Sequence, residues 1–359
     1  MAEPVLPARL AWAEGLPLNL PAPLLRLLES PGLPDDEIGL RDAAMALRIS
    51  AAFTNTPPAS SRLPVSYQAV PGKLRRIVAN AMGRAYRCRQ SAWARFPGWP
   101  LDLSADIAAD LAGVRTTTFA RTPVLVTHDI DSPEGLRNLR DMFLPLEEAA
   151  GARSAAYIVP CAWDVDEGLT REVLARGHEI GVHGYDHANR TAFAPPDERR
   201  NRLKAGHQFA RAHGAVGYRA PSLLRTAALI EDLQSLYRYD SSIPTSGGAF
   251  PTPNNGCASA RPWRFGRLWE LPLTMPRDGS LRFLGYSPGE IGALWRDVAA
   301  RIARSGGLVC LLTHCEAGFS GNSKMLAQYK SLLEWIAGES QYEYLRPLGL
   351  LDRLDAVDS

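Results

Sequence analysis

The sequence predicts an α/β fold in which a largely parallel sheet, open or closed into a barrel, is covered by helices. Two observations support this: strand-like and helix-like runs alternate from Val124 onward, and polar residues follow the ends of several strand-like runs. Alternating βα units are typical of parallel sheets, and active sites of barrels lie where the carboxyl ends of strands enter loops. We therefore expect a barrel-like domain at 121–352, preceded at 1–120 by an extension that is mainly helical or irregular.

Composition limits the classes of protein that this chain represents. Its 359 residues allow one large domain or two modest ones, and a net charge of +2 makes no case for nucleic-acid binding. The five cysteines are scattered without CxxC spacing, which argues against a disulfide framework or a structural zinc knot. We see no signal-peptide pattern and no uninterrupted apolar run of about 18 residues, so we expect a cytoplasmic protein without a transmembrane helix.

The extension is rich in proline and alanine, and Pro57-Pro58 with Ser60-Ser61 marks a loop. A basic segment follows at 72–97, and its apolar positions recur at helical spacing: Leu74, Ile77, Val78, Met82 and Tyr86. We favour a helix whose apolar side docks on the main domain and whose arginines are solvated. The alternative is an amphipathic helix that lies on an anionic membrane surface. A second helix is predicted at Ser104 to Leu111.

In the main domain, the first strand is the apolar run that begins at Val124. Helix-like runs follow at 134–150, 167–176, 197–213, 222–236, 288–304 and 323–337. Further strand-like runs occur at 154–159, 178–183, 216–219, 268–273 and 307–313. The predicted site residues are those that follow these strands.

The first strand ends in Thr127-His128-Asp129-Ile130-Asp131. Because side chains alternate along a strand, Asp129 and Asp131 should emerge on one face and His128 on the other. Two carboxylates that leave a buried strand together are costly unless a metal, a base or a hydrogen-bond network uses them. The alternative is a pair of capping aspartates ahead of a helix with Ser132 as N-cap and Pro133 at its first position.

A second group of polar residues follows the strand at 178–183. His183 and His187 lie four residues apart and could face one ion if the backbone turns helically there. The pair is weak evidence alone, but two imidazoles together with Asp131 would form an open metal site with room for water and substrate. Asp186 could support a ligand or serve only as a turn residue.

Four further residues are candidates that each have an ordinary structural interpretation. Arg219 could be a surface arginine, Ser222 begins a proline-initiated helix, and Asp240 lies in a segment that also reads as a plain turn. His314 follows an apolar strand and could be a core or capping residue. Cys315 beside it is discounted as a ligand, because small buried cysteines are common.

The order of these motifs resembles that of the polysaccharide deacetylases, the NodB-like proteins of carbohydrate esterase family 4. The motifs are Thr-His-Asp-Ile-Asp, His-Gly-Tyr-Asp-His, Arg-Ala-Pro-Ser, Tyr-Asp-Ser-Ser and Leu-Thr-His, and the match covers roughly residues 122–350. The resemblance implies a distorted (β/α)-barrel and leaves residues 1–120 unexplained. One ordered set of motifs is far more specific than any single motif.

The resemblance also implies roles for individual residues. Asp129 resembles the general base, Arg219 the arginine that holds this base, and His314 the general acid. The implied metal ligands are Asp131, His183 and His187, usually for zinc, with cobalt or nickel as alternatives. The Ser222 backbone would help to bind the oxyanion, and Asp240 would support the acid or shape the pocket.

Two departures from the common family pattern concern the substrate. A residue separates the two aspartates of the opening motif, where His128 replaces an aromatic residue, and Ser222 stands where an aromatic residue is frequent. We expect a hydrolase that removes an N-acetyl or related acyl group from a cell-surface polysaccharide sugar or its intracellular precursor. Cyclic-imide or allantoin-type hydrolysis and a non-catalytic carbohydrate-binding role are the alternatives. Peripheral contact with the inner face of the membrane and homo-oligomerisation stay open.

Overall fold

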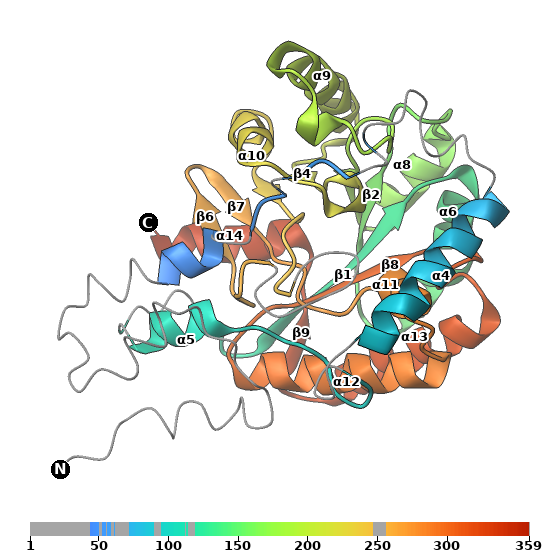
Figure 1. Cartoon of the computed structure of the whole chain (residues 1–359), viewed down its shortest axis with the longest axis vertical. Helices are drawn as coiled ribbons and strands as arrows, with labels where there is room; N and C mark the ends of the chain where they lie inside the picture. Colours follow the sequence, from blue (N-terminus) through green and yellow to red (C-terminus); the bar gives the residue numbers. More distant parts are fainter. Residues whose placement is uncertain are drawn as a thin grey trace.

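The computed structural model describes residues 44–49, 52–54, 56–58, 61, 72–89, 95–111, 113, 119–246 and 256–358. Its centre is a strongly curled sheet with helices on the outside, which confirms the predicted distorted-barrel class (Figure 1). The strands are β1 (Thr122–Ile130), β2 (Ala155–Ile158), β3 (Glu179–Val182), β4 (Gly217–Tyr218), β5 (Tyr239–Asp240), β6 (Trp263–Phe265), β7 (Leu268–Glu270), β8 (Val309–His314) and β9 (Tyr342–Tyr344).

The strands are ordered β6-β7-β5-β4-β3-β2-β1-β8, and β9 pairs with the start of β1. Every pair is parallel except β6–β7, so the carboxyl ends of the parallel strands meet at one rim. The segment after β7 returns to the far edge of the curl. There the Met275 N–H donates to Cys310 O at 3.2 Å, and the Cys310 N–H donates to Thr274 Oγ1 at 2.8 Å. These bonds draw β8 towards the β7 side of the sheet.

The helices that cover the sheet agree with the predicted ones where the apolar periodicity is strong. They are α6 (Pro133–Asn138), α7 (Leu144–Ala149), α8 (Glu167–Ala175), α9 (Pro196–His213), α10 (Ala227–Leu233), α11 (Asp278–Phe283), α12 (Pro288–Arg304), α13 (Ser323–Gly338) and α14 (Pro347–Asp358). A π-helical turn at Leu139–Phe143 joins α6 to α7, and short 3₁₀ turns lie at Thr191–Phe193 and Pro221–Leu223. The predicted helix at 222–236 is therefore much shorter, because its first residues form one of these turns.

Local signals fix the ends of several helices. Ser132 is the N-cap of α6, as predicted: its Oγ accepts from the Gly135 N–H at 3.1 Å, and Pro133 occupies the first turn. Ser287 and Glu290 form a capping box at the start of α12. The buried stripe of this helix runs from Ile291 through Trp295 to Ile302 and packs in the main core.

The described parts of the extension pack on the barrel. They include α4 (Gly72–Arg89) and α5 (Ser104–Leu111), the latter in agreement with the prediction. Asp106 in α5 accepts from the Ala260 N–H at 2.7 Å, and Ala52 O accepts from Arg225 Nε at 2.5 Å. At the other end of the chain, α14 continues beyond the predicted boundary at residue 352. Of the predicted loop, Ser60 lies outside the described residues.

Two further expectations concern cysteines and membranes. All five cysteines are free thiols in the structure. Across the described ranges, no helix combines the length and the apolar character needed to cross a membrane.

Candidate active site

The rim where the parallel strands end collects most of the predicted site residues. Asp129 lies near the end of β1 and is paired in register with His314 at the end of β8. Asp131 lies one residue beyond β1, His183 one residue beyond β3, and Arg219 one residue beyond β4. Residues separated by up to about 185 positions in the sequence are thus brought to one edge of the sheet, as expected for parallel βα units.

Asp131, His183 and His187 converge on one point. Asp131 Oδ1 lies 3.5 Å from His183 Nε2 and 3.4 Å from His187 Nε2, and one atom from each of the three residues lies within 4.8 Å of the others. Two ligand atoms about 2.1 Å from a tetrahedral zinc ion are about 3.4 Å apart, so the spacing suits a divalent ion. Asp131 Oδ1 and His183 Nε2 are buried and have no hydrogen-bond partner. Because buried polar atoms are normally paired, these residues fit a metal.

The backbone holds His183 in the orientation that a ligand needs. Its Nδ1 lies 3.0 Å from Arg219 O, to which it donates in the tautomer that leaves the Nε2 lone pair free. Burial lowers the pKa of His183 despite the nearby carboxylates Asp129 and Asp131, which favours the neutral ring that binds metals.

The loops that carry the site contain unusual backbone conformations. His187 has φ 54° and Ser222 has φ 51°, values that cost energy for residues with a Cβ. In the same turn as His187, Gly184 has φ 69°, and a Cβ there would lie 2.4 Å from the Pro221 ring. The sharp turn after β3 and the turn after β4 therefore pack against each other, and strain concentrates next to the candidate ligands.

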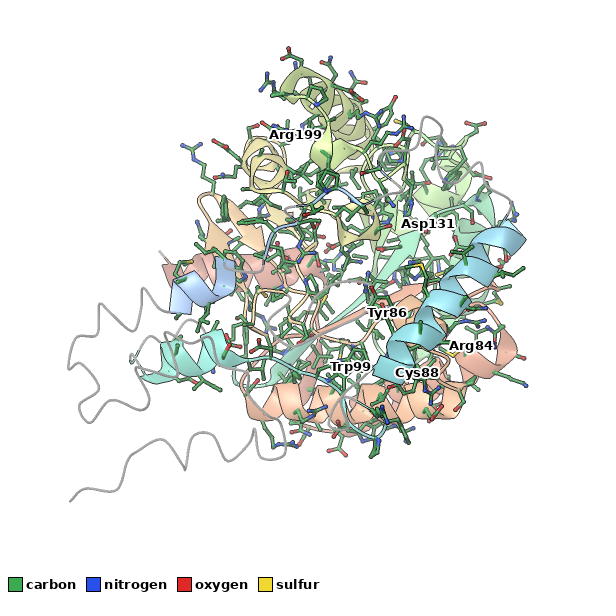
Figure 2. The ribbon with its side chains drawn as sticks, in the orientation of Figure 1. Arg84, Tyr86, Cys88, Trp99, Asp131 and Arg199 are labelled. Atoms are coloured by element: carbon green, nitrogen blue, oxygen red, sulfur yellow. The ribbon has the colours of Figure 1, made fainter. Side chains whose placement is uncertain are left out.

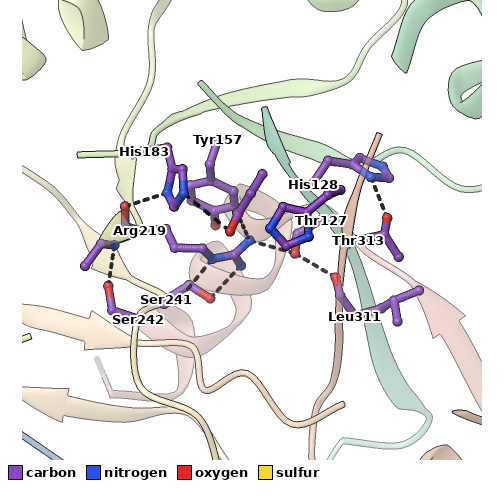
Figure 3. A network of polar contacts seen from close by, with 12 residues as sticks. Thr127, His128, Tyr157, His183, Arg219, Ser241, Ser242, Leu311 and Thr313 are labelled. Atoms are coloured by element: carbon purple, nitrogen blue, oxygen red, sulfur yellow. Dashed lines mark hydrogen bonds and ion pairs between the residues drawn. The ribbon is translucent and has the colours of Figure 1, made fainter. Parts of the chain in front are cut away.

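Asp129 is held by Arg219, which is fully buried. Arg219 Nη1 donates to Asp129 Oδ1 at 2.9 Å. Its Nε donates to Ser241 O at 2.9 Å, and its Nη2 donates to Ser241 Oγ at 3.0 Å (Figure 3). The guanidinium carbon also lies 3.9 Å from the centroid of the Tyr157 ring. Burial alone would raise the pKa of Asp129, but the charges of His183 and Arg219 outweigh it and lower the pKa to about 2. The carboxylate is thus ionised, with Oδ2 3.5 Å from His183 Nε2.

His314 is bound by a carboxylate that sequence reasoning missed. His314 Nδ1 lies 2.8 Å from Asp278 Oδ1, while the His314 N–H and Ser320 Oγ donate to Asp278 Oδ2 at 2.8 and 2.7 Å. Burial alone would lower the pKa of His314, but Asp278 outweighs it and raises the pKa to about 10. No spacing marks Asp278 in the sequence. The available signal was weak: a polar residue soon after the apolar run at 268–273.

Asp240 therefore does not support His314, and that part of the prediction is corrected. Asp240 Oδ1 accepts from Ser242 Oγ at 2.6 Å, and Ser242 Oγ accepts from the Ala220 N–H at 2.8 Å. Burial raises the pKa of both Asp240 and the neighbouring Glu270, which places them among buried structural groups. The physical reason is position: Asp240, the last residue of β5, braces through Ser242 the turn that carries Ser222. Its role in shaping the pocket stays a prediction.

Two nearby acids have other surroundings. Asp186 accepts from the Ala188 N–H at 3.0 Å and from Arg202 at 3.1 Å, so it is a turn residue. Glu316 accepts from Ser132 Oγ at 2.7 Å, and burial together with the charge of Asp131 raises its pKa. Its position beside Asp131 makes Glu316 an unpredicted acid at the rim of the site.

A second cluster of histidine and carboxylate lies on the opposite face of β1. His128 Nδ1 lies 2.9 Å from Thr313 Oγ1, and its Nε2 lies 2.8 Å from Glu147 Oε1, which also accepts from Tyr329 at 2.8 Å. His178 stands behind them. Its Nδ1 accepts from the Ser154 N–H at 2.9 Å, so its Nε2 carries the proton towards Glu148 at 3.2 Å. We call these residues (His128, Glu147, His178 and Tyr329) the rear cluster, and Asp131, His183 and His187 the front cluster.

Comparison with known proteins identifies the fold. No family model matches the sequence, and no curated protein does. A Mycobacterium smegmatis protein described as a "putative polysaccharide deacetylase" has a TM-score of 0.54 at 19% identity, with 67% of this chain and 92% of that one covered. Puue allantoinase has a TM-score of 0.53 at 13% identity, with 66% and 91% covered. A probable polysaccharide deacetylase from Pseudomonas aeruginosa PAO1 gives 0.51 at 12% identity, with 66% and 91% covered. The chain therefore has the NodB-like fold of the polysaccharide deacetylases.

Proposed function

We propose that this protein is a metal-dependent hydrolase that removes an N-acetyl or related acyl group from a sugar. The substrate would belong to a cell-surface polysaccharide or to its intracellular precursor. One observation carries the proposal: the unpaired Asp131 Oδ1 and His183 Nε2 adjoin an ionised Asp129, with His314 on the neighbouring strand. The likeness in fold to polysaccharide deacetylases supports the same class of reaction.

Asp131, His183 and His187 would hold the metal. Two imidazoles and a carboxylate suit zinc best, and cobalt or nickel would be accepted by the same donors. When bound there, a divalent ion would polarise the acyl carbonyl and make an attacking water easier to deprotonate.

The remaining residues would manage protons and charge. Asp129 would take the proton of the attacking water, because Arg219 keeps this carboxylate ionised and fixed by a charge-assisted hydrogen bond. The Ser222 backbone N–H would donate to the oxyanion of the tetrahedral species. An amine is a poor leaving group, so His314 would donate it a proton; Asp278 keeps His314 protonated for this purpose. Such acid–base assistance contributes about 10²–10⁴-fold.

A second candidate is hydrolysis of another C–N bond, as in a cyclic imide or allantoin. The likeness in fold to an allantoinase is close to that found for the deacetylases, which favours keeping this candidate. The same water-activating groups would serve both reactions. The difference would lie in the pocket that receives the substrate, so the substrate itself must separate the two.

The test is a substrate panel with the full chain supplied with zinc, cobalt or nickel. Free, nucleotide-linked and lipid-linked N-acetyl sugars would be assayed for acetate release, and allantoin and cyclic imides for ring opening. We expect acetate release that Asp129→Asn abolishes and that Asp197→Asn, a matched change at an exposed carboxylate, leaves intact. Ring opening without acetate release would establish the second candidate. Equal carbohydrate binding by wild type and Asp129→Asn, without turnover of any substrate, would indicate a non-catalytic binding protein.

A further inference from the structure

Helix α4 is turned the other way from the orientation that the sequence favoured. Its large apolar side chains point outward: Ile77 is 65% exposed, Val78 is 51% exposed and Met82 is 48% exposed. Ala81 and Ala85 on the same face are exposed as well. At about 100° per residue, these positions form one continuous stripe along the helix. The expectation that the apolar side of this helix docks on the main domain is therefore wrong.

The side that docks on the barrel is small and polar. Gly83 faces α11 so closely that a Cβ there would lie 1.7 Å from Phe283 O. Arg87 Nη1 donates to Gly285 O at 2.7 Å, and its guanidinium lies 4.8 Å from the centroid of the Tyr286 ring. Because only glycine permits this approach and Arg87 bonds to the backbone beyond α11, the rotation of α4 about its axis is fixed. Its apolar stripe is held away from the barrel.

Charge gives the second, independent observation on this helix. The 18 residues of α4 include six arginines or lysines and no acidic residue, whereas the whole chain has a net charge of only +2. Arg84, which borders the stripe, is exposed. Figure 2 shows the helix in blue across the front of the molecule, with Arg84, Tyr86 and Cys88 marked along it. An apolar stripe combined with many basic residues is typical of helices that lie in the interface of an anionic membrane.

We propose that α4 binds an anionic lipid surface through the stripe formed by Ile77, Val78, Ala81, Met82 and Ala85. The positive charge of the helix argues against a second copy of the chain as the occupant, because two such helices would bring like charges together. A lipid surface with negative headgroups complements both the charge and the apolar side chains. The proposal does not depend on the proposed reaction.

The place of α4 links this surface to the candidate active site. α4 packs against α11, and the first residue of α11 is Asp278, whose carboxylate binds His314. A membrane bound to the outer face of α4 would thus lie one helix away from the acid of the site. This arrangement would bring a membrane-held substrate to the protein and leave the chemistry of the site unchanged.

The experiment is co-sedimentation of the full chain with vesicles of phosphatidylcholine alone or mixed with phosphatidylglycerol. We expect binding only to the mixed vesicles, with weaker binding at high ionic strength. Ile77→Asn/Met82→Asn should weaken binding at least about tenfold, since two apolar side chains would no longer enter the interface. Arg84→Gln should weaken it about fivefold. The matched control is Met45→Asn/Ile49→Asn, which removes two apolar side chains exposed to 42% and 40% elsewhere.

Each of three results would overturn the proposal. One is wild-type chain that stays in solution with the mixed vesicles, and another is a control variant that loses binding as much as the α4 variant. The third is a monomer–oligomer difference between wild type and Ile77→Asn/Met82→Asn in the absence of lipid, which would assign the face to contact between copies. Circular dichroism of each variant ensures that lost binding reflects the surface, because the substituted side chains do not take part in the docking of α4 on α11.

Discussion

Each face of β1 carries a cluster of histidine and carboxylate side chains. The two clusters differ in whether their buried ring nitrogens have hydrogen-bond partners. In the front cluster, His183 Nε2 and Asp131 Oδ1 are buried without a partner. In the rear cluster, both ring nitrogens of His128 and both of His178 have a hydrogen-bond partner. Sequence position does not separate them, since His128 of the rear cluster lies only three residues before Asp131 of the front cluster. The difference lies in the imidazole nitrogens: the protein pairs all four of them in the rear cluster, where Glu147 Oε2 is left without a hydrogen-bond partner, but leaves His183 Nε2 unpaired in the front cluster.

This difference has a physical consequence for each cluster. A buried polar network in which the members are paired rigidifies the core, whereas unpaired buried atoms cost free energy unless a ligand uses them. The rear cluster should therefore contribute to stability and the front cluster to binding. Each of the following predictions changes one side of this comparison.

The largest effect should be loss of metal from the front cluster. We expect the wild-type chain, after exposure to zinc and gel filtration, to retain close to one equivalent. His183→Ala/His187→Ala should raise the dissociation constant for zinc by more than about 100-fold, because even changes outside the ligand shell cost 10–100-fold. Elemental analysis and competition with a chromogenic chelator measure both quantities.

The control for this prediction is a histidine outside both clusters. His207→Ala should leave zinc content unchanged, since His207 packs edge-on against Tyr237 and is not part of the group of side chains that could hold a metal ion. Zinc that is lost in Glu147→Gln but kept in His183→Ala/His187→Ala would reverse the assignment of the two clusters.

The next effect should be loss of stability from the rear cluster. Glu147→Ala removes the carboxylate that binds His128 Nε2 and the Tyr329 hydroxyl, and leaves these two buried groups without that partner. Leaving each buried polar group unsatisfied costs about 1–3 kcal/mol, and urea unfolding followed by circular dichroism would measure the loss. With a chelator present to remove metal, Asp131→Asn should change the free energy of unfolding by less than about 1 kcal/mol. A larger loss for Asp131→Asn than for Glu147→Ala would contradict the comparison.

Strand β1 and helix α12 show which features could be predicted from the sequence. Alternation along β1 correctly placed Asp129 and Asp131 on one face and His128 on the other, because period-two geometry is local. Likewise, the helix at 288–304 was predicted with its observed bounds, because its apolar periodicity is strong and a capping box marks its start. Local signals of this kind predict the structure correctly because contacts between distant parts of the chain do not change them.

Other features depend on contacts that no local pattern encodes. Asp278 begins a helix of six residues and meets His314 only through the fold. The strand β6 at Trp263–Phe265 was missed because three residues carry too little periodicity. For α4, periodicity correctly predicted a helix but not the direction of its apolar side, which a close contact at Gly83 determines.

A smaller effect should follow from changing how Asp129 is held at the front of β1. Arg219→Lys keeps the charge but cannot reproduce a planar group that bonds Asp129, Thr127 and Ser241 at once. Misplacement of the base by about 1 Å can cost about 100-fold, so kcat/KM on the substrate found by the panel should fall by about that factor. An unchanged zinc content would show that the front cluster is intact. Full activity in Arg219→Lys would show that Asp129 needs only a nearby positive charge.

The smallest expected effect concerns the dependence of stability on pH at His314. Asp278 raises the folded-state pKa of His314 to about 10, above the value of about 6.5 for an unperturbed histidine. The stabilisation is therefore complete below about pH 6.5 and is lost as the pH rises through about 10. In chelator, the free energy of unfolding of wild type should exceed that of His314→Gln by an amount that shrinks between these two pH values. A difference that grows with pH would mean that His314 is neutral in the folded protein, and Asp278 would then orient an acceptor instead of sustaining an acid.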